Sequence, residues 1–228
     1  MGLGVDKTAG TLTFYRGNRL ETLAERLCDL LSQPCGGPFE PETVVVSSRG
    51  MQRWLSLEIA ARLKVCANVN FPFQKAFVLD MFSRVLGGKK PGALFAREVM
   101  TQRIMEVLPC LATGDAWRAL EGYLALDPEG LKLYQLSSSL ANLFDQYLVY
   151  RPDMVAGWEE GKTSGEGDVE RWQKELWARA FGAAGFDHPA RMADEFCRAV
   201  GQAPAEVLPK RDFVFSVHSW PPSFLRVL

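Results

Sequence analysis

The chain has 228 residues, of which 47% are hydrophobic and 11% aromatic, and its formal net charge at pH 7 is −1. This composition excludes disordered, fibrous and collagenous proteins and is typical of a globular chain with one or two domains. No apolar run approaches the ~20 residues of a membrane-spanning helix, and the N-terminal MGLGVDKTAG lacks the basic and apolar regions of a secretory signal, so we expect a cytoplasmic protein without membrane contact.

The cysteines are odd in number, widely spread and without a C-x-x-C pair, and the chain has only two histidines. Neither a zinc site nor a disulfide framework is therefore expected, and buried free thiols are the simpler prediction. The residues are Cys28, Cys35, Cys66, Cys110, Cys197, His188 and His218.

The charge is unevenly distributed. Between Val44 and Ile104 ten Lys and Arg residues stand against Glu58, Asp80 and Glu98, so this stretch carries +7 and the rest of the chain −8. Such asymmetry indicates a surface for a polyanion. The alternative is that these cations belong to solvated helix faces.

The first part of the chain alternates strand and helix patterns. Residues 11–15 (TLTFY) predict a short strand, and the apolar positions from Leu20 to Leu31 then follow the three-four spacing of a helix. Residues 43–47 (TVVVS) predict a strand covered on both faces, as in a parallel sheet. After Ser48-Arg-Gly50 a second helix carries Trp54, Leu55, Ile59 and Leu63 on its apolar side. This order is the strand–helix–strand–helix signature of an α/β layer.

The middle of the chain is helical. After a rigid extended bridge at 71–73 (FPF), a helix is expected through Phe77 to Val85, and further helices over 92–107, 115–124, 131–150, 168–184 and 189–201. Turn residues separate them at Gly87-Gly88, Thr113–Asp115, Asp127-Pro128 and 161–167. The helix over 131–150 has the clearest core stripe, formed by Leu133, Leu136, Leu140, Leu143, Phe144, Tyr147 and Leu148.

Residues 212–217 (DFVFSV) predict a return to the sheet, and the pattern stops at Leu228 just after a new helix begins. We therefore expect a fragment of a longer polypeptide. The predicted fold class is α/β: a superfamily-one helicase-like parallel sheet layer with a large all-helical insertion. The expected parts are 1–88 and 206–228 for the layer and 89–205 for the helical insertion.

Nucleotide hydrolysis in such a layer requires a glycine-rich loop with Gly-Lys-Ser/Thr after the first strand and acidic residues after a later one. The first position holds Arg16-Gly-Asn-Arg-Leu20, and the second holds His218-Ser219. Gly4-Val-Asp-Lys7-Thr8 and Gly87-Gly-Lys-Lys90 are incomplete and misplaced versions of the loop. The ATPase motifs are thus missing from the sequence.

Other catalytic patterns are absent from the sequence as well. There is no G-x-S-x-G motif, the histidines lack the context of a triad, and no acidic cluster resembles a metal-dependent nuclease site. Five carboxylates around the 161–167 loop predict a solvated acidic surface: Glu159, Glu160, Glu166, Asp168 and Glu170. We expect no catalysis by this segment alone, and no cofactor or metal.

Several stretches resemble the N-terminal region of the RecC family, the gamma subunits of exodeoxyribonuclease V. They are Phe39–Glu42, Ser48–Leu55 (SRGMQRWL), Ala67–Pro72 (ANVNFP), Gln135–Ser138 and Leu143–Asp153 (LFDQYLVYRPD). The last run is the most specific, because no generic helix requires Asp-Gln-Tyr followed by Tyr-Arg-Pro-Asp. The resemblance covers essentially the whole chain but only the opening part of the longer family chains.

The resemblance implies a function. RecC proteins form a complex with RecB and RecD that unwinds and degrades duplex DNA ends in recombinational double-strand-break repair. Their N-terminal region is a helicase fold without ATPase function, which receives the 3′-ended single strand and scans it for the recombination signal Chi. For this chain the resemblance implies that single-stranded DNA, RecB and RecD are the partners.

The family's channel-lining positions fall on ten residues: Ser47, Arg49, Arg53, Phe73, Leu79, Asn142, Leu143, Asp145, Gln146 and Arg151. Leu143, Asp145, Gln146 and Arg151 keep the family pattern, whereas the other six differ from it. A DNA path is therefore expected, while the sequence that it reads stays open.

Physical chemistry gives these residues plausible roles. Arg49 and Arg53, four residues apart at a helix start, project from one face and oppose the helix dipole, a cost that a nearby phosphate would offset. Ser47, Ser48 and the Gly50 amide add donors there. On the helix over 131–150, a polar stripe opposite the leucines can read base edges. It consists of Ser138, Asn142, Asp145 and Gln146.

Structural roles compete with these for single residues. Phe73, Leu79 and Leu143 each fit a core better than a base contact, and Trp54 is most simply a core residue. Asp145 and Arg151 alternatively form an ion pair that caps the helix end, and Arg151 otherwise holds a phosphate. For the whole segment, the alternatives to DNA recognition are a scaffold that docks partner subunits and an active nucleotide hydrolase with an unrecognised phosphate loop.

Overall fold

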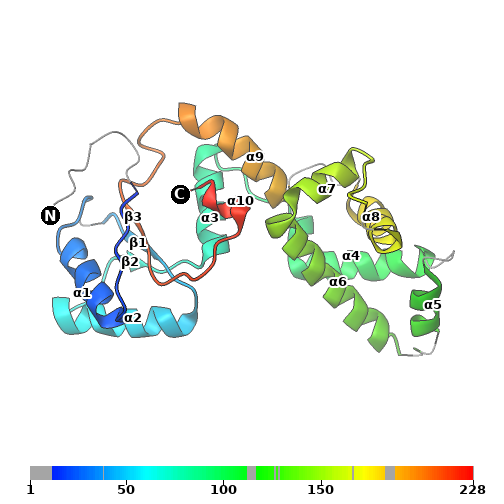
Figure 1. Cartoon of the computed structure of the whole chain (residues 1–228), viewed down its shortest axis with the longest axis horizontal. Coiled ribbons are helices and arrows are strands. Elements are labelled where there is room, and N and C mark those ends of the chain that lie inside the picture. Colours follow the sequence, from blue (N-terminus) through cyan, green and yellow to red (C-terminus); the bar gives the residue numbers. More distant parts are fainter. Residues whose placement is uncertain are drawn as a thin grey trace. The chain divides into compact units, whose positions relative to one another are not determined.

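The computed structural model describes residues 12–37, 39–111, 117–125, 127, 129–165, 167–182 and 188–227. The chain folds into two compact units with mostly helical content and one small sheet (Figure 1). Unit 1 comprises residues 12–77 with Pro209–Trp220, and unit 2 comprises Val78–Leu208 with Pro221–Val227. None of the helices in the described part of the chain is both long enough and apolar enough to span a membrane.

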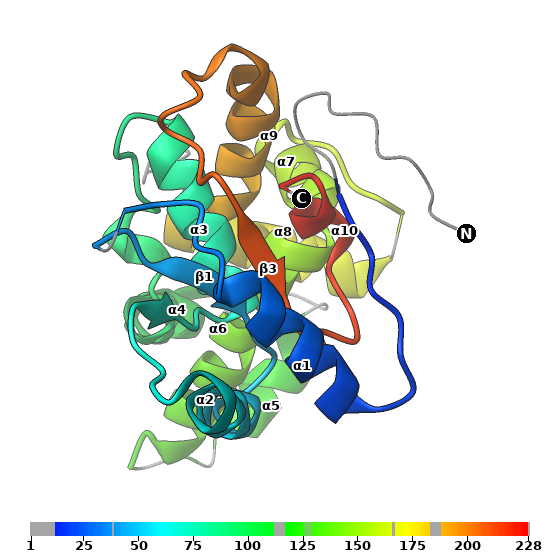
Figure 2. The ribbon, with the colours of Figure 1, turned by 90° about the vertical axis from the view of Figure 1, so that its left-hand side faces the viewer.

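Unit 1 contains a three-stranded parallel sheet. Strands β1 (Glu42–Val45), β2 (Val69–Asn70) and β3 (Asp212–Val214) lie in the order β2-β1-β3, and β1 runs parallel to both neighbours. Figure 2 shows β1 and β3 side by side. Val44 of β1 is paired with Phe213 of β3. The prediction of an α/β fold with a parallel sheet is confirmed, but the strand expected over 43–47 is Glu42–Val45, and Ser47 is exposed.

Two helices supply the core of unit 1. Helix α1 (Leu20–Leu31) buries Ala24, Leu27, Cys28 and Leu31, which recur at the spacing of one helix face. Helix α2 (Arg49–Leu63) buries Leu55 and Ile59. These side chains pack with Val44, Val46 and Phe215 from the sheet, so both predicted helices are confirmed. Trp54 is half-buried against this core, with its ring 6.2 Å from that of Phe215.

The predicted first strand is wrong over the residues that the structure describes. Thr11 lies outside them, and residues 12–15 are not a strand. Their side chains stand in solvent, with Leu12 exposed by 54% and Phe14 by 75%. A strand forms only where a neighbouring strand completes its hydrogen bonds, and no described strand pairs with residues 12–15. Conversely, β2 was not predicted, because two residues are too short for a periodic pattern.

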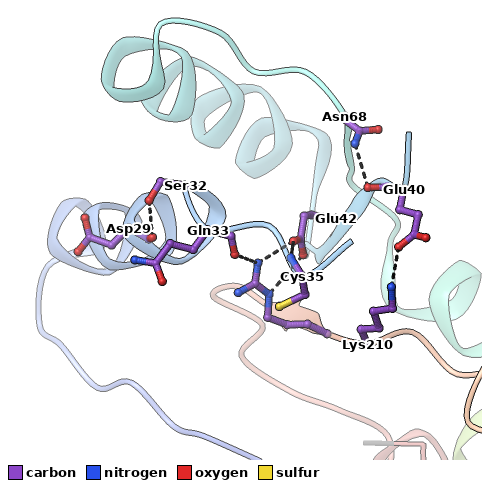
Figure 3. A network of polar contacts seen from close by, with 9 residues as sticks. Asp29, Ser32, Gln33, Cys35, Glu40, Glu42, Asn68 and Lys210 are labelled. Carbon is purple, nitrogen blue, oxygen red and sulfur yellow. Dashed lines mark hydrogen bonds and ion pairs between the residues drawn. The ribbon is translucent and has the colours of Figure 1, made fainter. Parts of the chain in front are cut away.

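A polar network holds the strands of unit 1 at their amino ends (Figure 3). Arg211, just before β3, donates to Glu42 at the start of β1, with Nη2 2.6 Å from Oε1, and also to the Gln33 carbonyl at 3.1 Å. The Cys35 amide donates to the same Glu42 oxygen at 3.2 Å. The Arg211 guanidinium also lies over the Phe213 ring, 4.8 Å from its centre. Both charged side chains are largely buried, at 21% and 11% exposure.

A second, exposed contact lies beside this network. Lys210 Nζ is 3.2 Å from Glu40 Oε2, and Asn68 Nδ2 donates to the Glu40 carbonyl at 2.9 Å (Figure 3). The hydrogen bond from Lys210 lowers the pKa of the Glu40 carboxyl below its usual value. Both partners remain more than 60% exposed, so solvent screens this pair.

Unit 2 is built from helices around a large apolar core. Helices α4 (Arg97–Leu111), α6 (Leu131–Tyr150), α7 (Pro152–Glu159) and α8 (Asp168–Phe181) line this core. Phe144 of α6 lies near its middle, with its ring 5.4 Å from that of Trp177. Further elements of the described chain are α3 (Gln74–Val85), η1 (Ala93–Phe95), α5 (Arg118–Leu124), α9 (Pro189–Ala199), η3 (Val200–Gln202) and α10 (Pro222–Leu225).

The helix predictions were mostly confirmed. The helix over 131–150 has the predicted bounds, and those expected around 77–85, 168–184 and 189–201 are α3, α8 and α9. The expected 92–107 helix is wrong, because it divides into η1 and α4 and continues past Pro109 to Leu111. Residues 113–116, 128, 183 and 184 of the predicted turns and helices lie outside the described residues.

Helix α7 was missed. It begins at Pro152, and a proline at the first helical position needs no amide partner, so the residue that ended one predicted helix starts the next. Arg151 between the two helices has non-helical dihedrals (φ −132°, ψ 49°), and the α region is disfavoured for a residue before proline.

Two carboxylates expected at an acidic surface are internal instead. Glu170 is only 3% exposed and accepts hydrogen bonds from Trp158 Nε1 at 2.8 Å and from the Ser164 amide at 2.6 Å. Glu159 Oε1 lies 3.0 Å from Nε2 of the buried His188, whose Nδ1 accepts from the Arg191 amide. The prediction of a solvated surface is therefore wrong for these two, and Glu166 lies outside the described residues.

The thiols are free, but most are not buried. Cys28 is buried, and burial raises the pKa of its thiol above the usual value. Cys66 is half-buried, while Cys35, Cys110 and Cys197 are exposed. The prediction of buried thiols is thus wrong for these three, because residue type alone does not decide whether a loop or helix position faces the core.

The buried ion pair of unit 1 should matter far more than the exposed one. Replacing Arg211 by Met should lower the free energy of unfolding by roughly 2 kcal/mol, because Glu42 then loses its charged donor in a largely buried site. The matched change Lys210→Met, at the neighbouring residue, should leave it nearly unchanged. Equilibrium urea denaturation measures both, and equal effects would contradict the difference in burial.

Candidate nucleic-acid interface

The ten residues predicted to line a DNA path fall into two groups, one in each unit. Unit 1 holds Ser47, Arg49, Arg53 and Phe73. Unit 2 holds Leu79 on α3, and Asn142, Leu143, Asp145, Gln146 and Arg151 on or just after α6. Each group is described within its own unit.

The group in unit 1 surrounds the start of α2, at the carboxyl end of β1. Ser48 has extended dihedrals (φ −159°, ψ 163°), and its Oγ accepts a hydrogen bond from the Met51 amide at 3.1 Å. Its carbonyl accepts the Gln52 amide at 3.0 Å, which begins the helical ladder. The amides of Arg49 and Gly50 precede that ladder, so they are available as donors to an anion.

Arg49 and Arg53 are exposed at this helix start. Neither side chain makes an ion pair or a hydrogen bond with any residue that the structure describes, and the first turn of α2 contains no acidic residue. Cations here oppose the helix dipole at a cost of roughly 0.3–1 kcal/mol each. The two guanidinium groups are therefore uncompensated within the described chain and able to bind an external anion.

Phe73 lies beside this helix start. Val46, the residue after β1, forms a parallel bridge with Phe73, and its amide donates to the Pro72 carbonyl at 3.1 Å. The Phe73 ring is 39% exposed, so it is not a core residue. Helix α3 starts at the next residue, Gln74, whose Nε2 donates to the Ser219 carbonyl at 2.7 Å.

The Gln74–Ser219 hydrogen bond ties the start of α3 to the segment that follows β3. The starts of α2 and α3 and the exits of β1 and β3 therefore meet at the carboxyl edge of the sheet, where ligands bind in open parallel sheets. Sequence analysis missed Gln74, because its partner is 145 residues away in the chain.

The positions expected for ATPase motifs lie in the described part of unit 1. Residues 16–19 form an irregular segment before α1, and the Arg16 and Arg19 side chains are exposed. His218 is exposed, and its Nδ1 lies 3.1 Å from the Ser216 carbonyl. Within the described residues, no three His, Cys, Asp or Glu side chains are grouped so that they could hold a metal ion.

The group in unit 2 depends on α6, whose start is anchored by a side chain. Asp127 Oδ2 accepts the Leu133 amide at 2.8 Å. Partial burial of Asp127 opposes its ionisation, but hydrogen bonds from the amides of Leu133, Lys132 and Leu131 outweigh it and lower the pKa of its carboxyl. Gly130, before the helix, has φ +72°, a conformation that glycine adopts without strain.

Helix α6 presents different chemistry on its two sides. Its inner side places Leu140, Phe144 and Leu148 in the core of unit 2. Asn142 and Gln146, one turn apart, are exposed on the outer side. Leu143 is half-buried and packs against the core of unit 2, so its contacts stabilise the fold. Asp145 is half-buried, and so is Leu79 on α3.

The end of α6 is held by backbone contacts. The Arg151 amide donates to the Tyr147 carbonyl at 2.9 Å, and the Arg151 carbonyl accepts the Met154 amide at 3.1 Å. The Asp145 and Arg151 groups each have an interaction partner, so neither is free in the way that Arg49 and Arg53 are. Ser138, the fourth member of the predicted stripe, is half-buried, so Asn142 and Gln146 are its exposed polar side chains.

Comparison with known proteins places this geometry in a family context. A family model described as RecC, N-terminal domain, matches residues 12–228. The RecBCD enzyme subunit RecC of Escherichia coli (strain K12) is 36% identical over 228 residues, covering 95% of this chain and 20% of that protein. The RecBCD enzyme subunit RecC of Haemophilus influenzae is 31% identical over 242 residues, covering 94% and 22%.

A more distant relative has the same description. The RecBCD enzyme subunit RecC of Mycobacterium tuberculosis (strain H37Rv) is 28% identical over 222 residues, covering 90% of this chain and 20% of that protein. The chain therefore spans about a fifth of the length of the curated relatives that it matches.

The Asp127 contact predicts a pH dependence for unit 2. Because its folded-state pKa is lowered, the carboxylate stabilises the folded state above the unfolded-state pKa of about 4, and this contribution is lost as the pH falls through the lower folded-state value. The Asp127→Asn variant should be less stable than the parent at pH 7, and the difference should shrink toward pH 2. Thermal unfolding across this range measures it; a constant difference would contradict the assignment.

Proposed function

Because the chain belongs to the RecC family, whose N-terminal domain it matches over residues 12–228, we propose that it is the DNA-handling part of a RecC-type subunit in a RecBCD-type complex. In this proposal it is a helicase-like layer without ATPase motifs, with a helical insertion over about 89–205. It guides the 3′-ended single strand, which the complex scans for Chi. It performs no catalysis itself, and RecB and RecD are its protein partners.

One observation carries the proposal: Arg49 and Arg53 stand exposed, without a partner among the described residues, at the start of α2. A folded protein gains nothing internally from two such cations at the positive end of a helix. A phosphodiester backbone supplies the missing anions, and the amides of Arg49 and Gly50 and the exposed Ser47 add donors to the same phosphate.

The outer side of α6 supports the second half of the proposal. Asn142 and Gln146 carry amides that can donate to and accept from base edges, and the three residues between them in the sequence include no cation. We assign phosphate contacts to Ser47, Arg49 and Arg53, and base contacts to Asn142 and Gln146. Phe73, Leu79, Leu143, Asp145 and Arg151 shape the path in this proposal, through apolar contacts or by holding their neighbours.

The competing function is a scaffold that docks the partner subunits without touching DNA. The exposed apolar residues of α2 favour it, since Leu57 is 61% exposed, and Val65 just beyond the helix is 62% exposed. The two functions differ in how DNA binding responds to the arginines.

Replacing Arg49 and Arg53 by Gln in the assembled complex should weaken single-strand binding roughly tenfold at low salt, because two phosphate contacts are lost. The slope of log K against log salt should fall by about 1.4, at ~0.7 for each contact. Fluorescence anisotropy with a labelled oligonucleotide measures both quantities. Lys64→Gln, at the opposite end of α2, is the matched control and should change neither.

Unchanged DNA binding in the double variant, combined with weaker assembly of the subunits, would replace the proposal by the scaffold function. Unchanged binding with intact assembly would remove both arginines from the DNA path.

The missing motifs predict that the 228-residue chain does not bind ATP. Calorimetric titration with ATP and magnesium should give no saturable heat, because Arg16–Leu20 supplies neither the lysine nor the Ser/Thr that hold phosphates and magnesium. Saturable binding in the micromolar range would reveal an unrecognised phosphate loop and refute the non-catalytic assignment.

A further inference from the structure

Tyr150, the last residue of α6, is an exposed aromatic side chain with no internal role. It is 57% exposed, and it makes no hydrogen bond, ring contact or cation contact with any residue in the described part of the chain. Tyr147, one turn earlier, is the opposite case: its hydroxyl donates to Gln173 at 3.1 Å, and its ring lies 5.9 Å from that of Trp158. Of the two tyrosines, only Tyr150 has a ring that is available to a ligand.

The backbone under Tyr150 is firmly held. The preceding residues Leu148 and Val149 are buried, and the Val149 carbonyl accepts a hydrogen bond from the buried Ser223 of α10. The following residue, Arg151, joins α6 to α7 through its amide and its carbonyl. An aromatic ring on such a support loses little freedom when a ligand binds, which favours affinity.

Tyr150 also continues the exposed polar line of α6. Asn142, Gln146 and Tyr150 are spaced by four residues, so each lies ~6 Å further along the helix and ~40° further around it than the one before. The three side chains therefore follow one face, on which two amides lead to an aromatic ring. Amides that meet base edges and a ring that meets a base plane are the two elements of single-strand recognition.

We propose that Tyr150 is a stacking platform for one base of the single strand, next to the base contacted by Gln146. The inference rests on the proposed function, because it takes the DNA path over Asn142 and Gln146 as given. The ligand is a nucleobase of any identity, since every base offers a π face. Tyr150 thus positions the strand, while the amides discriminate between bases.

The test uses the full-length subunit in its assembled complex, with Tyr150→Phe and Tyr150→Leu as paired variants. Phe keeps the ring and should bind a single-stranded oligonucleotide within about twofold of the parent, whereas Leu should bind roughly tenfold more weakly. An abasic site moved along the oligonucleotide should abolish this difference at one position only. Tyr123→Leu is the control, an exposed tyrosine (44%) on α5 rather than on α6, and should have no effect.

Two further variants separate the inference from the proposed function. If Asn142→Ala with Gln146→Ala weakens binding but Tyr150→Leu does not, the stacking role is overturned and the DNA path stands. If none of these variants changes DNA binding, the DNA path over α6 fails as well. If Tyr150→Leu lowers subunit assembly while DNA affinity is unchanged, the ring contacts a protein, and the inference is overturned.

Discussion

The sheet of unit 1 depends on the contact between Arg211 and Glu42. These residues are 169 positions apart, and their pairing attaches the returning strand β3 to β1 in parallel register. The same guanidinium reaches the Gln33 carbonyl after α1, so one side chain gathers three segments at the amino edge of the sheet. Fixing that edge fixes the opposite edge too, because strands in a ladder keep their register over their whole length. The starts of α2 and α3 lie at this opposite, carboxyl edge.

The two candidate surfaces differ in charge, as the phosphate backbone and the bases of a DNA single strand do. The start of α2 is cationic and offers free amides, which match a phosphate, while the outer side of α6 is uncharged at Asn142, Gln146 and Tyr150 and matches bases. Neither surface is needed by its own unit: the cores are built from the inner faces of the same helices. This separation of inner and outer faces allows the outer residues to change without loss of the fold.

Polar residues inside unit 2 show where sequence patterns mislead. Glu170 and Glu159 lie among charged neighbours in the sequence, and a solvated surface was the simplest expectation. Both are instead bonded to buried partners, Trp158 and His188, which come from segments 12 and 29 residues away. A charge pattern cannot reveal such partners, because a buried carboxylate is stable only where three-dimensional packing brings a donor to it. Helix α7 was not predicted, because Pro152 marks the end of the preceding helix in the sequence pattern, whereas in the structure it is the first residue of α7.

The amino-acid sequence by itself determined the elements with strong periodicity: the buried strand after Glu42, the amphipathic helices α1 and α2, and the bounds of α6. It also determined the absence of the ATPase motifs and the RecC resemblance, because both reside in contiguous residues. Only the tertiary structure decided that residues 12–15 stay outside the sheet, that Phe73 is exposed while Leu143 packs against the core, and that Arg49 and Arg53 have no partner in the described chain. These properties depend on what lies across from a residue in space, and local sequence encodes the propensity of a segment but not its neighbours.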